Sequence, residues 1–331
     1  IVGGAGGSVP TQTAEPNAED QLTGAEAKIA LALESQGAEP AVDVRSNVRN
    51  DVPIPRPPFW GTRVVDDISL DEVFGFVNDT ALIRGQWRFV RGAMTEDEYK
   101  QALEARIMPD YRKLREQIKS EQLLVPKVVY GYFPCQSDGN SLVVYRPPEG
   151  NALTEEAVAA SGRAPELARF TFPRQSGDRH LCIADYFSSV QSGKMDVFAC
   201  QIVTVGKKAS DHSKLLYDAN RYKDYLYFHG LSVESAEALA ELWHKRVREE
   251  LGIAGKDAAQ IKRLFSQGYQ GSRFSFGYAA CPRLEDQAKL FELLRPDRIG
   301  VFLTEEYQMD PEQSTSAIIV HHPEARYFTI T

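Results

Sequence analysis

Helix-like and strand-like segments follow one another in blocks along this chain, and this order constrains the fold most. Helical patterns come first, at 69–78, 95–107 and 110–124. Strand-like alternation follows at 126–134, 141–146, 167–172 and 196–205. Helical patterns at 210–228, 233–251 and 258–266 then precede short strands at 300–304, 315–321 and 325–330. Because strict βαβ alternation is missing, we predict an α+β fold with a largely antiparallel twisted sheet flanked by helices.

Polar residues and prolines mark the expected ends of several segments. Ser69 followed by Glu72 is a capping-box pattern, and Thr95 is placed to cap the next helix. Pro109 is expected to separate two helices, because proline disfavours the helical conformation in the residue before it. The sequence His322-Pro323-Glu324 predicts a hairpin-like turn between the last two strands.

The composition changes near residue 53 and divides the chain into two parts. Residues 1–52 are rich in Gly, Ala, Glu, Pro, Ser and Thr and almost lack aromatic side chains. Such a segment can bury little apolar surface, so we predict a flexible linker from an upstream module. Four prolines between 53 and 58 then lead into a folded domain, residues 53–331. Because the chain begins with Ile1, we expect it to be a piece of a longer polypeptide.

Charge and cysteine content argue against several classes of function. The net charge of −8 argues against nucleic acid as a main partner, because phosphate contacts need clustered Lys and Arg. No run of 18 apolar residues is present, so we expect no membrane span. The four cysteines are scattered without a C-x-x-C pair, which predicts neither a disulfide framework nor a zinc site and favours the reducing cytoplasm. Rossmann and Walker sequences are also missing.

The stretch 269–282, rich in glycine and aromatic residues, is the candidate binding loop. Gly271 and Gly277 punctuate it, and Arg273 is its one cation. A guanidinium suits bidentate recognition of a carboxylate. The backbone of 275–278 can approach a ligand closely, because Gly277 has no side chain. Two interpretations stay open: the loop binds a small zwitterion, or it is a packed irregular loop whose Arg273 makes an ordinary surface ion pair.

Other polar groups also allow more than one interpretation. Glu234, Glu237 and Glu241 recur at three- and four-residue spacing, so they lie near one helix face that either meets a cationic ligand or is solvated. Asp185, in an apolar run, is either a buried base with a raised pKa or a structural carboxylate. The adjacent pair His321-His322 lies in a predicted strand and points to opposite faces, so we do not expect it to bind one metal ion.

The residues of the candidate loop resemble a known family. Arg273-Phe-Ser-Phe-Gly-Tyr278, followed by Ala-Ala-Cys-Pro282, is similar to the R-x-x-x-G-Y signature of the C-terminal reactivation domain of cobalamin-dependent methionine synthase. Other segments match in the same order: 57–61, 80–87, 130–134, 185–187, 228–230, 236–244 and 311–323. The resemblance covers about residues 53 to 331, nearly the whole folded part.

The resemblance implies that the domain binds S-adenosylmethionine. The parent enzyme of the family makes methionine by moving a methyl group from methyltetrahydrofolate to homocysteine through cobalamin. When the cobalt is oxidised, this domain docks over the cobalamin-binding domain, flavodoxin or an equivalent donor supplies an electron, and S-adenosylmethionine supplies the methyl group. The chain is therefore expected to be a fragment of a methyltransferase. Methyl transfer to cobalt moves no proton, so positioning and electrostatics suffice without a general base.

The family pattern implies a role for each residue that matches it. Arg273 would take the ligand carboxylate, and Glu237 would face the positive charges of the ligand. The backbone from Ser275 through Gly277 to Tyr278 would hold the adenosine side. These roles follow from the resemblance, whereas residue chemistry alone indicates only a site for a zwitterion.

Two further matches concern the last predicted strand and an early helix. Tyr327 and Phe328 correspond to an aromatic pair in the last strand of the family. Asn78 stands where some members carry an aspartate, and it keeps an acceptor oxygen but loses the charge. Either the adjacent Asp79 substitutes for that charge, or binding relies more on Glu237.

Two alternatives belong to other functional classes. The first is a stand-alone module of the same fold that binds a corrinoid protein or docks a reductase. The presence of a cobalamin module upstream in the full gene would separate it from the reactivation domain. The second is a generic hydrolase that uses Asp185 or His180, for which the sequence contains no nucleophile motif.

Overall fold

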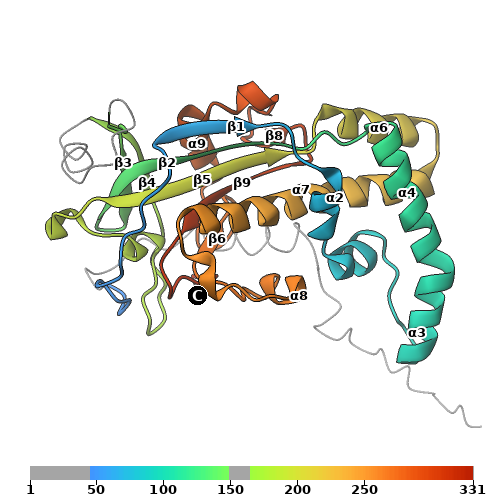
Figure 1. The fold of residues 1–331 in the computed structure, drawn as a ribbon, viewed down its shortest axis with the longest axis horizontal. Coiled ribbons are helices and arrows are strands. Elements are labelled where there is room, and N and C mark those ends of the chain that lie inside the picture. The colour runs from blue at the N-terminus through green and yellow to red at the C-terminus, as the bar shows by residue number, and fades with distance from the viewer. Residues whose placement is uncertain (1–44, 149–164, 331) are drawn as a thin grey trace, which may run out of the picture.

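An antiparallel sheet forms the centre of the fold (Figure 1). The computed structural model describes residues 45–148 and 165–330. Six strands follow the order β4-β3-β2-β5-β9-β6, and β1 pairs with β2. These strands are β1 Gly61–Val65, β2 Lys127–Asp138, β3 Ser141–Tyr145, β4 Glu166–Thr171, β5 Asp196–Thr204, β6 Ser272–Phe274 and β9 Ser314–Val320. Each ladder between them is antiparallel, which confirms the predicted α+β class. A separate ribbon pairs β7 Phe302–Leu303 with β8 Met309–Asp310.

Helices form about half of the remaining described chain. The α-helices are α2 Leu70–Gly75, α3 Glu96–Ala102, α4 Met108–Ser120, α6 Lys207–Asp218, α7 Tyr222–Glu250, α8 Ile261–Leu264 and α9 Gln287–Leu294. Wider π-helical turns form η1 Ala81–Gln86 and η2 Leu103–Ile107. Short 3-10 turns are η4 Ile183–Tyr186, η5 Val190–Ser192, η6 Ala254–Lys256, η7 Leu284–Asp286 and η8 Pro296–Ile299.

The predicted N-caps of the first helices are confirmed, with one difference in detail. The Thr95 hydroxyl accepts the N–H of Glu98, whose carboxylate accepts the N–H of Thr95, which is a complete capping box. The Ser69 hydroxyl accepts the N–H of Asp71. Ser69 therefore caps α2 without the reciprocal bond predicted from Glu72.

The predicted separation of two helices at Pro109 is wrong. The π-helical turn η2 follows α3 directly and leads straight into α4. Pro109 lies in the first turn of α4. Proline disturbs a regular helix because it lacks an N–H donor and crowds the preceding turn, and here the preceding turn is the π-helical η2 rather than an α-helical one. The chain therefore stays helical from α3 to α4.

The helix break predicted at 229–232 lies elsewhere. Helix α7 runs without interruption through Gly230, and the break comes at residues 219–221, where Asn220 has φ of +57°. Asparagine tolerates this left-handed conformation better than most residues. Gly230 serves packing instead, since a Cβ at this position would lie 2.8 Å from the Gln86 Cβ.

Two predicted elements near the C-terminus are shorter or missing. Only Ile261–Leu264 is α-helical in the segment predicted as 258–266. Residues 325–330 pair with no strand among the described residues, so the predicted last strand is wrong. The predicted turn before it does form, with the Ala325 N–H donating to the carbonyl oxygen of His322 (3.0 Å). Single hydrogen bonds fix this segment instead, from Ser176 N to Ile330 O (3.0 Å) and from Gln175 Nε2 to Thr329 O (3.0 Å).

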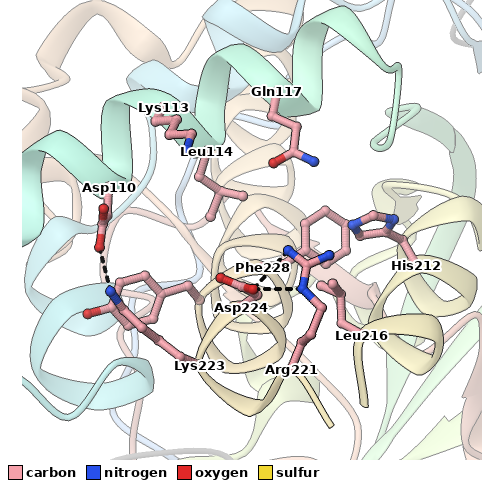
Figure 2. A pocket seen from close by; sticks show the side chains of 11 residues that line it. Asp110, Lys113, Leu114, Gln117, His212, Leu216, Arg221, Lys223, Asp224 and Phe228 are labelled. Carbon is pink, nitrogen blue, oxygen red and sulfur yellow. Dashed lines mark hydrogen bonds and ion pairs between the residues drawn. The ribbon is translucent and has the colours of Figure 1, made fainter. Parts of the chain in front are cut away.

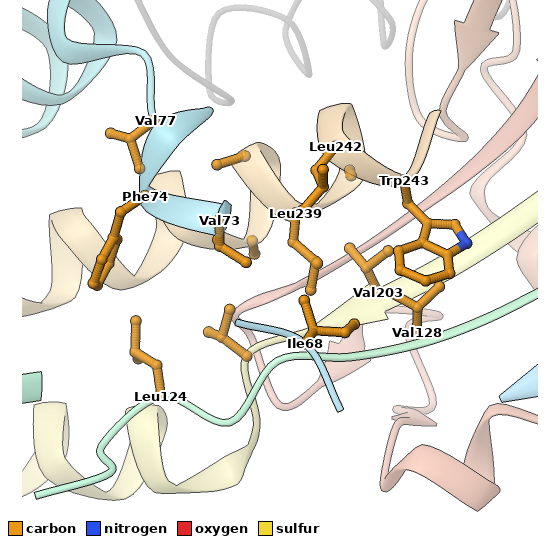
Figure 3. Close-up of a cluster of buried hydrophobic side chains, with 14 of the residues drawn as sticks. Ile68, Val73, Phe74, Val77, Leu124, Val128, Val203, Leu239, Leu242 and Trp243 are labelled. Atoms are coloured by element: carbon orange, nitrogen blue, oxygen red, sulfur yellow. The ribbon is translucent and has the colours of Figure 1, made fainter. Parts of the chain in front are cut away.

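The two faces of the sheet carry separate hydrophobic cores. Along β2, Val128, Tyr130 and Tyr132 belong to one cluster, and Val129 and Phe133 to the other. In the first cluster, side chains of α2 and α7 meet those of β2 and β5 (Figure 3). The second cluster includes side chains of η4 and α9. Because both faces are covered, β5 is buried along its whole length.

Polar contacts fix helix α7 against the sheet. Buried Gln201 on β5 donates from Nε2 to the carbonyl oxygen of Ala240 (2.9 Å). At the end of the helix, the Glu250 carboxylate accepts the phenol protons of Tyr130 (2.9 Å) and Tyr132 (2.6 Å) on β2. The helix is therefore held at its middle and at its C-terminal end, so its register against the sheet is fixed.

The described residues before β1 contact the folded body. Ser46 donates from its N–H (3.1 Å) and its hydroxyl (2.7 Å) to Asp185 Oδ2. His322 Nε2 lies 2.9 Å from the carbonyl oxygen of Arg49. Val48 packs against the second core. Most of the predicted linker, residues 1–44, lies outside the described residues.

Two chemical features bear on the expectations drawn from composition. Cys135, Cys182, Cys200 and Cys281 are all buried and form no disulfide. Within 45–148 and 165–330, none of the helices has the length and apolar character required to cross a bilayer.

Replacing Gly230 with alanine should destabilise the protein. The new methyl group would crowd Gln86 and Trp87, and overpacking of this kind costs about 1–3 kcal/mol of the free energy of unfolding. Gly85→Ala is the matched control, because no atom lies within 4 Å of a Cβ there. Urea unfolding should show a clear loss for Gly230→Ala and none for Gly85→Ala. Equal stabilities would contradict the packing described for α7.

Candidate functional site

The backbone at the edge of the sheet directs the side chain of Arg273 toward helix α7. Strand β6 pairs with β9, with Arg273 opposite Ile319. Phe274 points into the second core, so the side chain of Arg273 points to the opposite face, where α7 lies. Gly271 precedes the strand with φ of +87°, and a Cβ there would lie 2.4 Å from the carbonyl oxygen of Val320. Only glycine fits this approach without a shift of the backbone.

Arg273 lies beside two carboxylates that are one turn apart on α7. Its Nη2 is 3.4 Å from Glu237 Oε2 and 3.5 Å from Glu241 Oε2. The side chain of Glu237 is 48% exposed, that of Arg273 21% and that of Glu241 7%. Burial lowers the pKa of Arg273, but the adjacent carboxylates of Glu241 and Glu237 outweigh this effect and raise it. The guanidinium therefore stays charged at a position that solvent reaches.

The exposure of Glu237 marks an opening over α7. In the described part of the chain, Glu237 is the one exposed residue of α7 between Leu231 and Arg248. The other residues of this stretch are buried or partly buried. A half-exposed carboxylate beside a half-buried guanidinium can meet a ligand that carries both charges.

A tight turn at residues 277–281 follows strand β6. Gly277 has φ of +84°, and its N–H donates to the carbonyl oxygen of Cys281 (2.9 Å). The N–H of Cys281 in turn donates to the carbonyl oxygen of Tyr278 (2.8 Å). Burial and the negative charge of Glu237 raise the pKa of Tyr278 to about 12, so its phenol stays protonated and can donate a hydrogen bond.

A family model for the activation domain of vitamin B12 dependent methionine synthase matches residues 75–331. The chain belongs to this activation-domain family. The methionine synthase of Mycobacterium tuberculosis (strain ATCC 25618 / H37Rv) is 42% identical over an alignment of 315 residues, and the match covers 91% of this chain and 25% of the relative. The methionine synthase of Mycobacterium leprae (strain TN) is 41% identical with the same coverage. The chain therefore spans about a quarter of the length of these curated relatives.

A solved structure has the same fold as this activation domain. It is the crystal structure of the MetH reactivation domain bound to AdoHcy, with a TM-score of 0.73 at 24% identity. The match covers 93% of this chain and 89% of the other. The predicted family and fold class are thus both confirmed.

The activation domain places the predicted aromatic pair on two sides of its C-terminal segment. Tyr327 is 48% exposed, and burial raises the pKa of its phenol while the backbone N–H of Ala279 in the loop opposes this rise. Phe328 is buried, and its ring centroid lies 6.0 Å from that of Phe274 in the second core. Tyr327 therefore lies beside the loop, whereas Phe328 supports strand β6 from behind.

Asn78 and Asp79 have partners of their own. The side-chain oxygen of Asn78 accepts the N–H groups of Thr80 (3.1 Å) and Ala81 (3.3 Å) and so caps the first turn of η1. Burial raises the pKa of Asp79, and the nearby Arg115 opposes this effect. The structure thus gives Asn78 a local structural role. Neither residue is among the partners of Arg273 described above.

The three glutamates of α7 are not a solvated face. Glu234 and Glu241 are buried, and Glu234 Oε1 accepts a hydrogen bond from Gln86 Nε2 (3.3 Å). The solvated interpretation was therefore wrong for two of the three. Glu241 belongs to this site, although the family resemblance gave it no role. Its spacing of four residues from Glu237 was the available signal, because it places both carboxylates on one face.

A second layer of charged and aromatic groups lies behind Arg273. Arg248 is fully buried, pairs with Asp257 at 2.7 Å and stacks over the ring of Tyr269 at 4.0 Å. His244 meets the same ring edge-on, with centroids 5.0 Å apart. Burial and the cations of Arg248 and Arg273 hold the pKa of His244 well below its usual range, so this imidazole is neutral.

Asp185 and the two adjacent histidines serve structural contacts. Arg174 donates to both carboxylate oxygens of Asp185, which is almost fully buried. Burial opposes the charge, but hydrogen bonds from Arg174 and Ser46 outweigh burial and lower the pKa of Asp185. The interpretation of Asp185 as a base with a raised pKa is therefore wrong. His321 pairs with Asp196 at 2.7 Å, and Glu324 N donates to Nδ1 of His322 at 3.1 Å.

A pocket of about 160 Å³ lies in another part of the activation domain, between α4, α6 and the start of α7 (Figure 2). No residue of the predicted site lines it. Its acids face cations, with Lys223 2.8 Å from Asp110 and Arg221 2.8 Å from Asp224. We interpret it as a polar helix junction, because these charges are already paired.

Replacing Asp185 with asparagine should strongly destabilise the activation domain. Removal of one partner of a buried ion pair costs about 3–5 kcal/mol of the free energy of unfolding. Because the pKa of Asp185 is lowered in the folded state, its contribution is present above the ordinary pKa of aspartate and is lost as pH falls through the lowered value. Urea unfolding of wild type and Asp185→Asn should therefore differ most at neutral pH and converge in acid.

Asp297→Asn is the matched control for this measurement. Asp297 forms an exposed ion pair with Arg295, and exposed pairs contribute little. A loss for Asp185→Asn no larger than the loss for Asp297→Asn would contradict the structural role of the buried pair.

Proposed function

We propose that this chain binds S-adenosylmethionine and serves as the reactivation module of cobalamin-dependent methionine synthase. The observation that carries the proposal is a guanidinium next to a half-exposed carboxylate at the open edge of the sheet. A ligand with a carboxylate, an ammonium and a sulfonium complements this pair of charges. The solved relative of the same fold, whose ligand is AdoHcy, supports this choice of ligand class.

Arg273 binds the ligand carboxylate, and its position supports this role. The guanidinium is charged, partly exposed and held at long distances by two glutamates, so a ligand carboxylate can form shorter hydrogen bonds with it. Glu237 then turns toward the ammonium and sulfonium of the ligand. The exposure of its side chain leaves it room to do so.

The loop and the C-terminal segment hold the adenosine side. The backbone of Ser275, Gly277 and Tyr278 approaches the ligand without obstruction by a side chain at Gly277. Tyr327 covers the adenosine from the C-terminal segment, and its exposed ring next to the loop supports this role. Phe328 acts indirectly, because its ring packs against the ring of Phe274 on strand β6. Asn78 acts by capping η1, which places Gln86 against Glu234 of α7.

Reactivation joins this module to other parts of the same enzyme. S-adenosylmethionine supplies its methyl group for the reductive methylation of oxidised cobalamin, and flavodoxin or an equivalent donor supplies the electron. Cobalamin is held mainly by another domain of the parent enzyme, which acts in the cytoplasm as a 5-methyltetrahydrofolate–homocysteine methyltransferase. The methionine synthase relatives, four times as long as the matched part, support this assignment. The residues of this chain bind and orient the ligand, and none has to move a proton.

Arg273→Ala should weaken S-adenosylmethionine binding more than Asn78→Ala. A hydrogen bond to a charged group contributes about 1.5–3 kcal/mol, so calorimetric titration should show a loss of roughly tenfold to hundredfold in affinity. Asn78→Ala should lose less, because Asn78 acts through the cap of η1. Arg283→Ala, which removes an exposed cation near the loop, is the matched control and should bind like wild type.

Two results would contradict the proposal. Folded wild-type protein that gives no heat and no thermal shift at millimolar ligand does not bind S-adenosylmethionine. Equal losses for Arg273→Ala and Arg283→Ala would place the ligand carboxylate elsewhere.

A further inference from the structure

Glu241 is a buried carboxylate, and among the described residues its one ion-pair partner is Arg273, the proposed ligand anchor. Its Oε2 lies 3.5 Å from Arg273 Nη2, and its side chain is 7% exposed. Its Oε1 is buried and accepts no hydrogen bond from any described residue. A buried carboxylate with an unsatisfied oxygen is costly, so its charge depends on Arg273.

Among the described residues, Arg273 is the cation that lies within ion-pair distance of Glu241. Arg248 also favours the charge of Glu241, but its own ion pair is with Asp257. His244 and Tyr269 are neutral, since burial and nearby cations lower the pKa of His244, and burial and the Glu241 charge raise the pKa of Tyr269 to about 12. Glu237, one turn away, and Asp257 are acids that disfavour a charged Glu241.

A ligand carboxylate at Arg273 would become the third acid beside one guanidinium. Glu237 is half exposed, so it can turn to water or to the ammonium of the ligand. Glu241 is buried and has no such alternative. When acids share a site in this way, one of them takes up a proton.

We propose that Glu241 takes up a proton from solvent when the ligand carboxylate binds Arg273, so that Glu241 couples ligand affinity to pH. The inference rests on the proposed function. The protonated carboxyl group gains an O–H donor, which can reach the ligand carboxylate beside Arg273. Glu241 is then a positioning residue that rejects the anion when ionised and holds it when neutral.

Burial already favours the protonated form of Glu241 in the free protein. Desolvation raises the pKa of Glu241 in the free protein, and the cations of Arg273 and Arg248 oppose the rise. A ligand that takes over Arg273 removes part of this opposition and raises the pKa further. Protons are therefore taken up at pH values between the pKa of Glu241 in the free protein and its higher pKa in the complex. Ligand affinity falls as pH rises from the first of these pKa values to the second.

Calorimetric titration with S-adenosylmethionine in two buffers of different ionisation enthalpy measures this proton uptake. The titrations run from about pH 5 to about pH 7, below the pKa of an α-amino group, so the ligand ammonium stays charged throughout. Wild type should take up a fraction of one proton per ligand, and its affinity should fall by up to tenfold per pH unit in that range.

Glu241→Gln is the decisive variant, because glutamine has the shape of the protonated acid and cannot titrate. It should bind without proton uptake, with an affinity that is independent of pH and no weaker than that of wild type at pH 7. Glu237→Gln is the matched control on the same helix: it should bind more weakly but keep the proton uptake. Urea unfolding checks that both variants fold, and the wild-type uptake tests the proposal even without them.

The outcomes separate this inference from the proposed function. Tight binding that depends on Arg273, but without proton uptake by wild type, overturns the role of Glu241 and leaves the proposed function intact. Equal uptake by wild type and Glu241→Gln places the proton on another group and also overturns it. No binding by folded wild type overturns both proposals.

Discussion

The packing of helix α7 across the sheet is the constraint on which the candidate site depends. Glu237 and Glu241 come from this helix, while Arg273 comes from the edge strand β6. The three side chains meet only if the helix has one register against the strands. The Gln201 bond to Ala240 and the two tyrosine bonds to Glu250 set that register. Interactions in the middle of the domain thus determine a charge arrangement at its edge.

The charges around Arg273 are graded by burial, and this gradient suggests how the site works. Arg248 and Asp257 form a closed pair behind the site. Glu241 is buried without a full set of hydrogen bonds, and Glu237 is half in solvent. Electrostatic interactions strengthen as water is excluded, so the deepest pair is the most rigid and the outermost acid the easiest to displace. A ligand would therefore rearrange the outer charges while the inner pair keeps the loop in place.

Hydrophobic patterns predicted the sheet because a strand that is buried on both faces is mostly apolar, as β5 is apart from Asp196, Gln201 and Thr204. It failed at helix ends, where single residues decide. The helix break lies at Asn220, which has a left-handed backbone conformation. Gly230 does not break the helix, and its missing side chain allows α7 to pack closely on Trp87. The last segment resembled a strand, but β6 already occupies the neighbouring edge of β9. Pairing of this kind depends on the whole fold, which local patterns do not contain.

The candidate site was predictable in part. Residue chemistry pointed to Arg273, the family resemblance gave Glu237 its role, and the structure brings the two side chains together. The resemblance gave no role to Glu241, because its burial and its orphan oxygen appear only in three dimensions.

A crystal structure of this chain with S-adenosylmethionine tests the account most directly. The account predicts the ligand carboxylate about 3 Å from the Arg273 guanidinium, with Glu237 turned toward the ligand cation. A ligand bound elsewhere, with Arg273 still beside both glutamates, would contradict it.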